Sequence, residues 1–321
     1  MTGPGDAPTA TSGPGRLAAE YVLPLRWGAG QDVAGMTAYL AELADWVDVT
    51  VVDGSEPEVY RRHCDAWTPL VRHVPPGPSA GRNGKVRGVL TGIALSRHEY
   101  IVIADDDVRY DRAGLEAVLA ELEQADLVVP QNVFSAWPWH ARWDTGRQLL
   151  NRCFGGDYPG TLAARREFVA DGYDPDVLFE NLELMRTVAA RGGRVVRADH
   201  VFVDRLPPTA RHFWSQRVRQ AYDSFAQPGR LLLELAVLPL LWSLRRRPAG
   251  LAAVAVVVAG LAERGRRRAG GAGRFPATAA LWAPVWALER AVCAWCAVYL
   301  RVRGGVRYSG GRIATAANRR R

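Results

Sequence analysis

Three consecutive aspartates, Asp105, Asp106 and Asp107, follow the apolar run at residues 100–103. That run is rich in β-branched residues and predicts a buried strand, so the aspartates come at its carboxyl end. Carboxylates two residues apart can reach one hard cation, and such a cation can bridge two phosphate oxygens. The spacing therefore predicts a divalent metal site at Asp105 and Asp107, and the alternative is an acidic turn exposed to water.

The only lysine of the chain, Lys85, lies shortly upstream in Gly-Arg-Asn-Gly-Lys. The chain has 41 lysines and arginines, so every other basic residue of this kind is an arginine. The glycines predict a flexible loop, and the compact ammonium group is suited to contact a phosphate or a base carbonyl. Val86 follows the lysine where a P-loop requires a hydroxyl, which argues against a P-loop nucleotidase.

The composition is that of a globular protein, with 48% hydrophobic and 23% charged residues among 321. The net charge of +8 favours partners that carry phosphate, namely nucleic acid, anionic lipid or a nucleoside diphosphate. Four cysteines have no spacing typical of a zinc site, and we expect reduced thiols in a protein that faces the cytosol. The first sixteen residues resemble a disordered tail rather than a signal peptide.

Strand-like and helix-like segments alternate from residue 21 to about residue 225, which predicts an α/β domain with a mostly parallel sheet. Such sheets bind ligands beyond the carboxyl ends of their strands. Asp53 and the three aspartates both follow predicted strands. The expected strands are 21–25, 49–52, 71–74, 100–103 and 127–129, and the expected helices are 32–47, 88–96 and 113–125.

Three apolar bands follow residue 228, at 231–244, 249–262 and 277–300, with arginine clusters between them. As helices the first two bands reach only about 21 Å, which is short of the roughly 30 Å of bilayer hydrocarbon. The third reaches about 36 Å, but Glu289 and Arg290 would lie near its middle. We therefore expect helices that lie in the membrane interface with arginines facing anionic lipid, and the alternative is a soluble helical subdomain.

The run GRNGKVRGVLTGIALSRHEYIVIADDDVRYD at 81–111 resembles the core of family 2 glycosyltransferases, in which a loop, a small-residue helix, a strand and Asp-x-Asp follow in this order. Val-Val-Asp-Gly-Ser at 51–55 resembles the first nucleotide-contacting motif of the family, with valine in place of the first aspartate. Pro24-Leu25-Arg26 resembles its opening strand. The resemblance covers about residues 21–222 and implies one α/β nucleotide-sugar-binding domain of the GT-A fold.

The resemblance also implies roles for individual residues. Asp105 and Asp107 would bind Mg²⁺ or Mn²⁺ and, through it, the diphosphate, with Asp106 as the spacer between them. Asp53 would contact the base or ribose, and Lys85 the nucleotide. The residues implied to bind the sugar donor are Pro24, Asp53, Lys85, Asp105, Asp106, Gln216 and Arg219.

The segment GYDPDVLFENLELMRTVAARGG at 172–193 resembles the family's Glu-Asp helix, whose aspartate is usually the catalytic base. This chain has Glu180-Asn181, and an amide cannot take a proton from an acceptor hydroxyl. We expect Glu180 to be the base, with Glu183, one turn further along the helix, as second choice. The alternatives are that both are solvated acids at a helix start, or that the site is inactive.

Residues 214–220, WSQRVRQ, resemble the Gln-x-x-Arg-Trp motif of the processive and lipid-modifying branches. Gln216 and Arg219 match, and Gln220 stands where tryptophan is expected. Arg219 would neutralise the leaving diphosphate, whereas a basic amphipathic helix at the membrane surface is the alternative. Residues 305–310 also resemble a short tail motif of lipid-directed relatives.

These features predict a metal-dependent, inverting glycosyltransferase that moves a sugar from a UDP- or GDP-linked donor to a hydroxyl of a lipid or lipid-linked acceptor. It would act at the cytoplasmic side of the cell membrane. The alternatives are a catalytically silent protein that retains the fold, and a nucleic-acid binder. The second is disfavoured because no element clusters aromatic and basic residues, and the arginines concentrate beside the apolar bands instead. The expected regions are a disordered tail at 1–19, the catalytic domain at 20–227, membrane-associated helices at 228–303 and a basic tail at 304–321.

Overall fold

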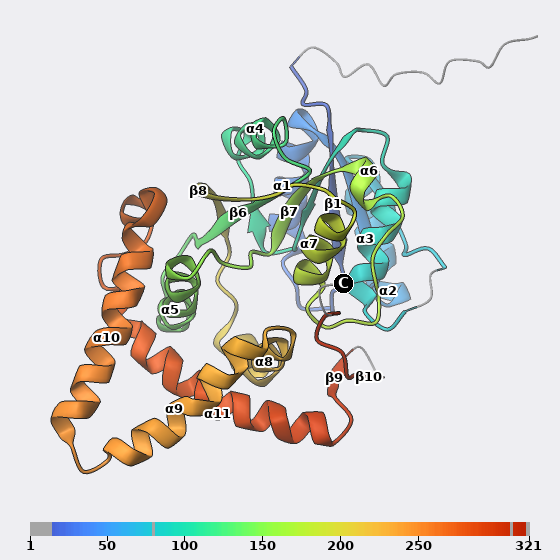
Figure 1. The fold of residues 1–321 in the computed structure, drawn as a ribbon. Coiled ribbons are helices and arrows are strands. Elements are labelled where there is room, and N and C mark those ends of the chain that lie inside the picture. Colours follow the sequence, from blue (N-terminus) through green and yellow to red (C-terminus); the bar gives the residue numbers. More distant parts are fainter. Residues whose placement is uncertain (1–14, 79–80, 309–310, 319–321) are drawn as a thin grey trace, which may run out of the picture.

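The computed structural model describes residues 15–78, 81–308 and 311–318, and an eight-stranded sheet forms its centre (Figure 1). The expected tail at 1–19 lies mostly outside the described residues. The strand order is β3-β2-β1-β4-β7-β6-β8-β5. The strands are β1 (Ala19–Leu25), β2 (Asp48–Asp53), β3 (Arg72–Val74), β4 (Tyr100–Ala104), β5 (Val108–Arg109), β6 (Leu127–Phe134), β7 (Thr161–Arg165) and β8 (Val195–Arg205).

The sheet is mixed but mostly parallel, which confirms the predicted α/β class. β1, β2, β3 and β4 are parallel neighbours, and β6 is parallel to β8. β7 runs antiparallel to both β4 and β6, and β5 runs antiparallel to β8. The chain reverses its direction of winding after β3, so β1 and β4 flank the point where ligands bind in such sheets.

Helices cover both faces of the sheet. α1 (Val33–Trp46), α2 (Pro57–Trp67) and α4 (Arg112–Glu121) cover one face, and α3 (Gly84–Leu95), α6 (Arg166–Val169) and α7 (Glu180–Ala190) cover the other. Side chains of β1 alternate accordingly, because Tyr21 and Leu23 pack toward α1 while Val22 packs toward α3. Each helix and strand predicted from the sequence is present. α3 begins four residues earlier than predicted, because Asn83 caps it and satisfies the amides of Lys85 and Val86.

The five remaining long helices gather at the end of the molecule that lies away from α4 (Figure 1). They are α5 (Trp139–Cys153), α8 (Ala210–Tyr222), α9 (Pro228–Leu244), α10 (Pro248–Arg267) and α11 (Ala283–Val302). Short 3₁₀ turns are η1 (Asp223–Ala226), η2 (Arg268–Gly273) and η3 (Ala279–Trp282), and the chain returns through the hairpin β9 (Val306–Tyr308) and β10 (Gly311–Ile313).

A buried arginine of α5 connects the sheet to α10. Arg152 donates to the carbonyls of Asp199 at 2.9 Å and Gly265 at 3.1 Å, and to Gln131 Oε1 at 3.0 Å. Arg268 donates in return to the Arg152 carbonyl at 2.9 Å. These bonds satisfy a fully buried guanidinium and fix α10 on the domain.

The contact between α5 and α10 depends on Gly265, where an added Cβ would lie 1.9 Å from the carbonyl oxygen of Leu149. We expect Gly265→Ala to lower the free energy of unfolding by about 1–3 kcal/mol, because the crowding atom belongs to backbone and cannot rotate away. Gly260 is a matched control in the same helix, since an added Cβ there meets nothing within 4 Å. Gly260→Ala should stabilise the chain by about 0.5–1 kcal/mol. Thermal unfolding followed by circular dichroism tests both, and equal midpoints for the two variants would contradict this packing.

Residues 315 and 316 pack against the start of α7. The amide of Phe179 donates to the carbonyl of Ala316 at 2.7 Å, and the amide of Leu178 donates to that of Thr315 at 3.0 Å. The region expected as a basic tail therefore includes residues that fix the position of Glu180, the first residue of α7.

Candidate active site

A cavity of about 660 Å³ opens at the carboxyl ends of β1, β2 and β4. Helix α8 and strand β9 close it from the other side, through residues such as His212 and Tyr308. The structure brings most of the sequence-predicted site residues to its walls. These are Pro24, Lys85, Asp105, Asp106, Glu180, Gln216 and Arg219.

Lys85 is the electrostatic centre of the cavity. Its Nζ lies 2.5 Å from Asp105 Oδ1 and 2.6 Å from Glu180 Oε1, so one ammonium joins the strand β4 side to the helix α7 side. Burial alone would lower the pKa of Lys85, but the two carboxylates outweigh it and raise that pKa above its ordinary value. Lys85 is therefore a fixed positive charge, available to a phosphate group.

The Asp107 carboxylate pairs with a different cation from that of Asp105, namely Arg205. Its Oδ2 lies 2.8 Å from both Nε and a terminal nitrogen of Arg205, because β5 pairs with the end of β8. Its Oδ1 is buried and has no hydrogen-bond partner among the described residues. A buried carboxylate oxygen without a partner is costly unless a cation or donor reaches it.

The acidic turn is compatible with a divalent cation. The carboxylates at Asp105 and Asp107 are hard oxygen ligands, and among the described residues they pair with the side-chain cations of Lys85 and Arg205. Gly160 packs against the first of them, since a Cβ added there would lie 2.7 Å from Asp105 Oδ2. The unpartnered Oδ1 of Asp107 and this close glycine fit the Mg²⁺ or Mn²⁺ expected from the sequence, although they define no coordination geometry.

Asp106 belongs to a chain of hydrogen bonds that leads back to β2. Its Oδ2 accepts from the indole nitrogen of Trp27, whose backbone amide donates to Ser55 Oγ at 2.8 Å. The amide of Ser55 donates in turn to Asp53 Oδ1 at 2.8 Å. Burial is the main cause that raises the pKa of Asp106, while the Trp27 bond opposes it. Asp106 thus supports the loop after β1.

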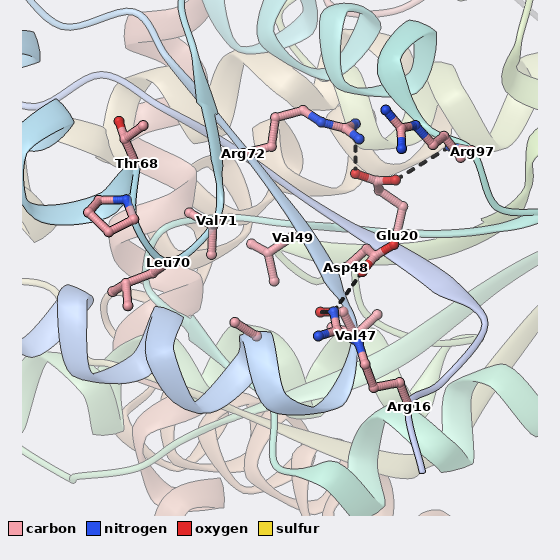
Figure 2. Close-up of a pocket in the computed structure, with 12 residues that line it drawn as sticks. Arg16, Glu20, Val47, Asp48, Val49, Thr68, Leu70, Val71, Arg72 and Arg97 are labelled. Atoms are coloured by element: carbon pink, nitrogen blue, oxygen red, sulfur yellow. Dashed lines mark hydrogen bonds and ion pairs between the residues drawn. The ribbon is translucent and has the colours of Figure 1, made fainter. Parts of the chain in front are cut away.

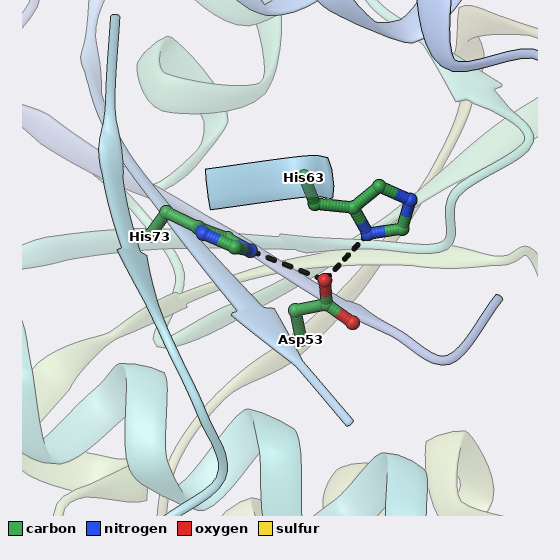
Figure 3. Close-up of side chains that lie close together, drawn as sticks. All are labelled: Asp53, His63 and His73. Carbon is green, nitrogen blue, oxygen red and sulfur yellow. Dashed lines mark hydrogen bonds and ion pairs between the residues drawn. The ribbon is translucent and has the colours of Figure 1, made fainter. Parts of the chain in front are cut away.

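The Asp53 carboxylate does not reach the cavity wall. It is buried, and its Oδ2 lies 2.6 Å from His63 Nδ1 and 3.1 Å from His73 Nε2 (Figure 3). The rings stack on aromatic neighbours, His63 on Trp67 and His73 on Tyr60. Although these three residues could also hold a metal ion, the carboxylate oxygen already bonds both rings. The neighbours of Asp53, Val52 and Gly54, line the cavity instead.

Asp53 should stabilise the fold in a pH-dependent way. Burial would raise its pKa, but hydrogen bonds from His73, Ser55 and His63 outweigh burial and lower it to about 2. The lowered pKa contributes on the order of 2 kcal/mol at neutral pH, and this is lost as the pH falls from about 4 to about 2. We expect Asp53→Asn to lose this contribution at pH 7, measured by urea unfolding. Asp45→Asn, at an exposed position of α1, should leave the urea midpoint unchanged; a similar loss in both variants would contradict the assignment.

The two glutamates expected near the catalytic base lie in different surroundings. Glu180 faces the cavity and Lys85. Glu183 is buried against the returning chain, where it accepts from the backbone amide of Asn318 at 2.7 Å and from its side-chain nitrogen at 2.8 Å. Asn181 donates to the carbonyl of Pro159 at 2.7 Å, so its amide holds the loop before β7. Only Glu180 of the two glutamates lines the cavity.

Gln216 and Arg219 lie one turn apart on α8, on the side that faces the cavity. Arg219 Nε donates to Gln216 Oε1 at 2.5 Å, and its guanidinium lies 5.6 Å from the ring centre of Tyr308. Tyr308 comes from the tail motif at 305–310, so that motif contributes to the same cavity wall. A guanidinium held in this way can meet an anionic ligand without moving far.

A further cavity, of about 400 Å³, lies at the opposite edge of the sheet, near the amino ends of β1 and β2 (Figure 2). Four of its five charged side chains form ion pairs. Arg72 lies 3.2 Å from Glu20, and Arg16 lies 2.6 Å from Asp48. The fifth, Arg97, contacts Glu20 through its backbone amide.

Residues 42–171, which include the acidic turn, match the family model Glycosyl transferase family 2. This segment is a glycosyl transferase family 2 domain. The match confirms the expected enzyme class, a glycosyltransferase. No protein with a curated description matches the sequence.

A solved structure is similar in fold to this glycosyltransferase. The mannosyltransferase PcManGT from Pyrobaculum calidifontis, in complex with GDP-Man and Mn²⁺, has a TM-score of 0.51 and 19% identity over 87% of each chain. Glucosyl-3-phosphoglycerate synthase from Mycobacterium tuberculosis, in complex with Mn²⁺ and uridine-diphosphate-glucose, has a TM-score of 0.43 and 16% identity, over 63% of this chain and 76% of that one. At 19% identity the likeness to the mannosyltransferase concerns the fold alone.

Proposed function

We propose that this chain is an inverting, metal-dependent glycosyltransferase that uses a UDP- or GDP-linked sugar. The acceptor would be a hydroxyl of a lipid or lipid-linked molecule at the cytoplasmic face of the cell membrane. The meeting of Lys85, Asp105 and Glu180 on one cavity wall carries the proposal, because it combines a phosphate-binding cation, a metal ligand and a base. The likeness to a mannosyltransferase that holds GDP-Man and Mn²⁺ supports a nucleotide-linked sugar donor.

Each residue of the site would have a distinct role in sugar transfer. Asp105 and Asp107 would hold Mg²⁺ or Mn²⁺, which neutralises charge on the diphosphate when bound. Lys85 and Arg219 bind the phosphates and stabilise the negative charge that develops on the leaving nucleotide. Glu180 accepts the proton of the acceptor hydroxyl as that oxygen attacks the anomeric carbon. Asp53 acts indirectly, by fixing Ser55 and through it Trp27.

Sugar-donor binding would also release the base. Glu180 shares the ammonium of Lys85 with Asp105, and a bound diphosphate competes for that same ammonium. Once Lys85 turns to the phosphates, the Glu180 carboxylate is free to accept a hydrogen bond from the acceptor. This predicts that the sugar donor binds before the acceptor.

The C-terminal helices support a membrane surface. Residues Pro248–Gly273 and Ala279–Val302 are long and apolar enough to cross a membrane by length and composition alone. In α11, however, the charged pair in mid-helix faces inward: Arg290 is 2% exposed, and Glu289 lies 3.8 Å from Arg217. The exposed large apolar side chains of η3 and α11 recur every three or four residues and form one apolar stripe, at Leu281, Val285, Leu288, Val292, Trp295, Tyr299 and Val302.

Such a one-sided stripe favours a helix that lies in the membrane interface over one that spans the bilayer. α9 and α10 add further exposed apolar residues, including Leu233, Trp242 and Val256. We therefore propose residues 20–227 as the catalytic domain and 228–303 as the membrane-associated region. Residues 304–321 would then be a basic tail whose described part contacts the site.

A transfer assay tests the function. The full chain is incubated with labelled UDP- or GDP-sugars and Mn²⁺, together with either a membrane lipid extract or water-soluble sugars. We expect label in the lipid fraction, and transfer only to water-soluble acceptors would contradict the lipid part of the proposal.

Flotation with anionic liposomes tests the membrane association. The wild type should float with the liposomes, and a variant with both Leu288→Glu and Val292→Glu should not. Leu70, which is exposed on the α/β domain, gives the control, because Leu70→Glu should float like the wild type.

A catalytically silent protein is the second candidate, favoured by Asn181 in the position where the family usually has its base. Metal-dependent binding of a nucleoside diphosphate with neither transfer nor hydrolysis of any nucleotide sugar would favour this reading. Turnover that depends on Glu180 would exclude it.

A further inference from the structure

A smaller cavity, of about 130 Å³, shares Glu180 and Arg219 with the sugar-donor cavity. Elements far apart in the sequence enclose it, among them α5, α7, α8, α9 and α11. Its walls are strongly positive. Five arginines line it, namely Arg147, Arg205, Arg219, Arg230 and Arg290.

Three of these guanidinium groups are neutralised by carboxylates outside the cavity lining. The pairs are Arg147 with Asp157 at 2.7 Å, Arg205 with Asp107 at 2.8 Å and Arg230 with Glu234 at 2.9 Å. Arg219 and Arg290 form no such ion pair with the described residues. The cavity therefore keeps an excess of positive charge.

Arg290 is the most informative of the five. It is 2% exposed, and its Nε and one terminal nitrogen are buried without a hydrogen-bond partner among the described residues. Its nearest described aromatic contact is Trp286, with the guanidinium 5.1 Å from the ring centre. A buried guanidinium with unused donors is costly unless an anion reaches it, so this side chain points to a ligand.

Two acids also line the cavity. Glu180 is paired with Lys85 at 2.6 Å, and the other, Asp223, opposes an anion only weakly. Asp223 is buried at Oδ1 without a partner, and burial raises its pKa to about 7, against the lowering effect of Arg219. It therefore carries only part of a negative charge at neutral pH. The charged groups around it are Glu180 from α7, Arg219 from α8, Arg230 from α9 and Arg290 from α11.

We infer that this cavity binds a phosphate group of the acceptor, on the far side of Glu180 from Lys85. Guanidinium groups with free donors match phosphate oxygens in geometry and charge. The volume suits a single anionic group, since whole drug-sized ligands occupy about 300–1,000 Å³. The inference rests on the proposed function in one respect, that Glu180 faces the acceptor.

Methyl phosphate is the direct probe, titrated calorimetrically into the full chain in detergent, with and without saturating nucleoside diphosphate and Mn²⁺. We expect methyl phosphate to bind in both conditions, because Arg290 lines this cavity and not the sugar-donor cavity. The isosteric change Gln220→Glu adds a negative charge to the wall without altering side-chain shape, and should weaken methyl phosphate binding about tenfold or more. Arg290→Gln should do the same.

Gln124→Glu, on an exposed position after α4, is the matched control and should bind methyl phosphate like the wild type. A Gln220→Glu variant that binds methyl phosphate like the wild type would overturn the inference. So would displacement of methyl phosphate by the nucleotide. Failure of the proposed function would be seen separately, as a lack of metal-dependent nucleotide binding in the same titrations.

The origin of the phosphate is decided by comparing methyl with dodecyl phosphate in the same detergent. Tighter binding of dodecyl phosphate assigns the group to a lipid acceptor, because Arg230 and Arg290 come from α9 and α11, which carry exposed apolar side chains. Equal binding assigns it to a phosphorylated soluble acceptor. Either result keeps the phosphate site, and absence of binding by both removes it.

Discussion

Glu180→Gln should lower the rate of sugar transfer by about 10²–10⁴-fold, because an amide cannot accept the proton of the acceptor hydroxyl. Binding of the nucleotide should be retained or strengthened, since Lys85 loses a competing carboxylate. Single-turnover transfer and nucleotide titration measure the two effects separately. A fall in transfer without a fall in nucleotide affinity is the expected pattern.

Glu183→Gln is the control for this prediction. Glu183 accepts two hydrogen bonds from Asn318, and a glutamine oxygen can still accept them in part. We expect a lower unfolding temperature and transfer within a few-fold of the wild type. Transfer that survives Glu180→Gln but is lost in Glu183→Gln would assign the base to Glu183.

Asp105→Asn should weaken metal-dependent binding of a nucleoside diphosphate by at least about 10–100-fold, the loss typical even of residues that only support metal ligands. The amide keeps the size of the side chain but lacks the charge that a hard cation requires. Asp107→Asn should act in the same way and also release Arg205. Calorimetry with and without Mn²⁺ measures the effect.

Asp111→Asn is the matched control, because it lies in the same acidic segment. Asp111 caps α4 by accepting from the amide of Gly114 at 2.7 Å, and asparagine is an equally good cap. Its nucleotide binding should not change. Equal losses in the Asp105 and Asp111 variants would mean that general negative charge, rather than a metal site, explains the binding.

Local signals predicted the part of the site that lies at strand ends. Lys85 and Asp105 belong to one continuous segment, and a parallel sheet brings its carboxyl ends together, so their proximity followed from the sequence. The α/β class of the fold could also be predicted from local signals, because strand-like and helix-like segments alternate along the chain. Asp53 also follows a strand, yet its side chain turns to His63 and His73, whose positions no local pattern indicates.

The other half of the site depends on contacts between distant segments. Arg205, Tyr308 and Arg290 reach the cavities only because β8, the hairpin and α11 return to the same place. The carbonyls of Thr315 and Ala316 fix the start of α7, and backbone bonds of this kind leave no mark in side-chain types. In the sequence, Glu289 and Arg290 argued against a membrane-spanning helix at 277–300. In the structure they lie on the inward side of the amphipathic helix α11.

Metal-dependent nucleotide binding is tested most directly by calorimetric titration of the wild-type chain with UDP and with GDP, each in the presence and absence of Mn²⁺. We expect at least one nucleotide to bind, Mn²⁺ to strengthen its binding, and Asp105→Asn to remove the effect of the metal. No metal-dependent binding of either nucleotide would contradict this expectation.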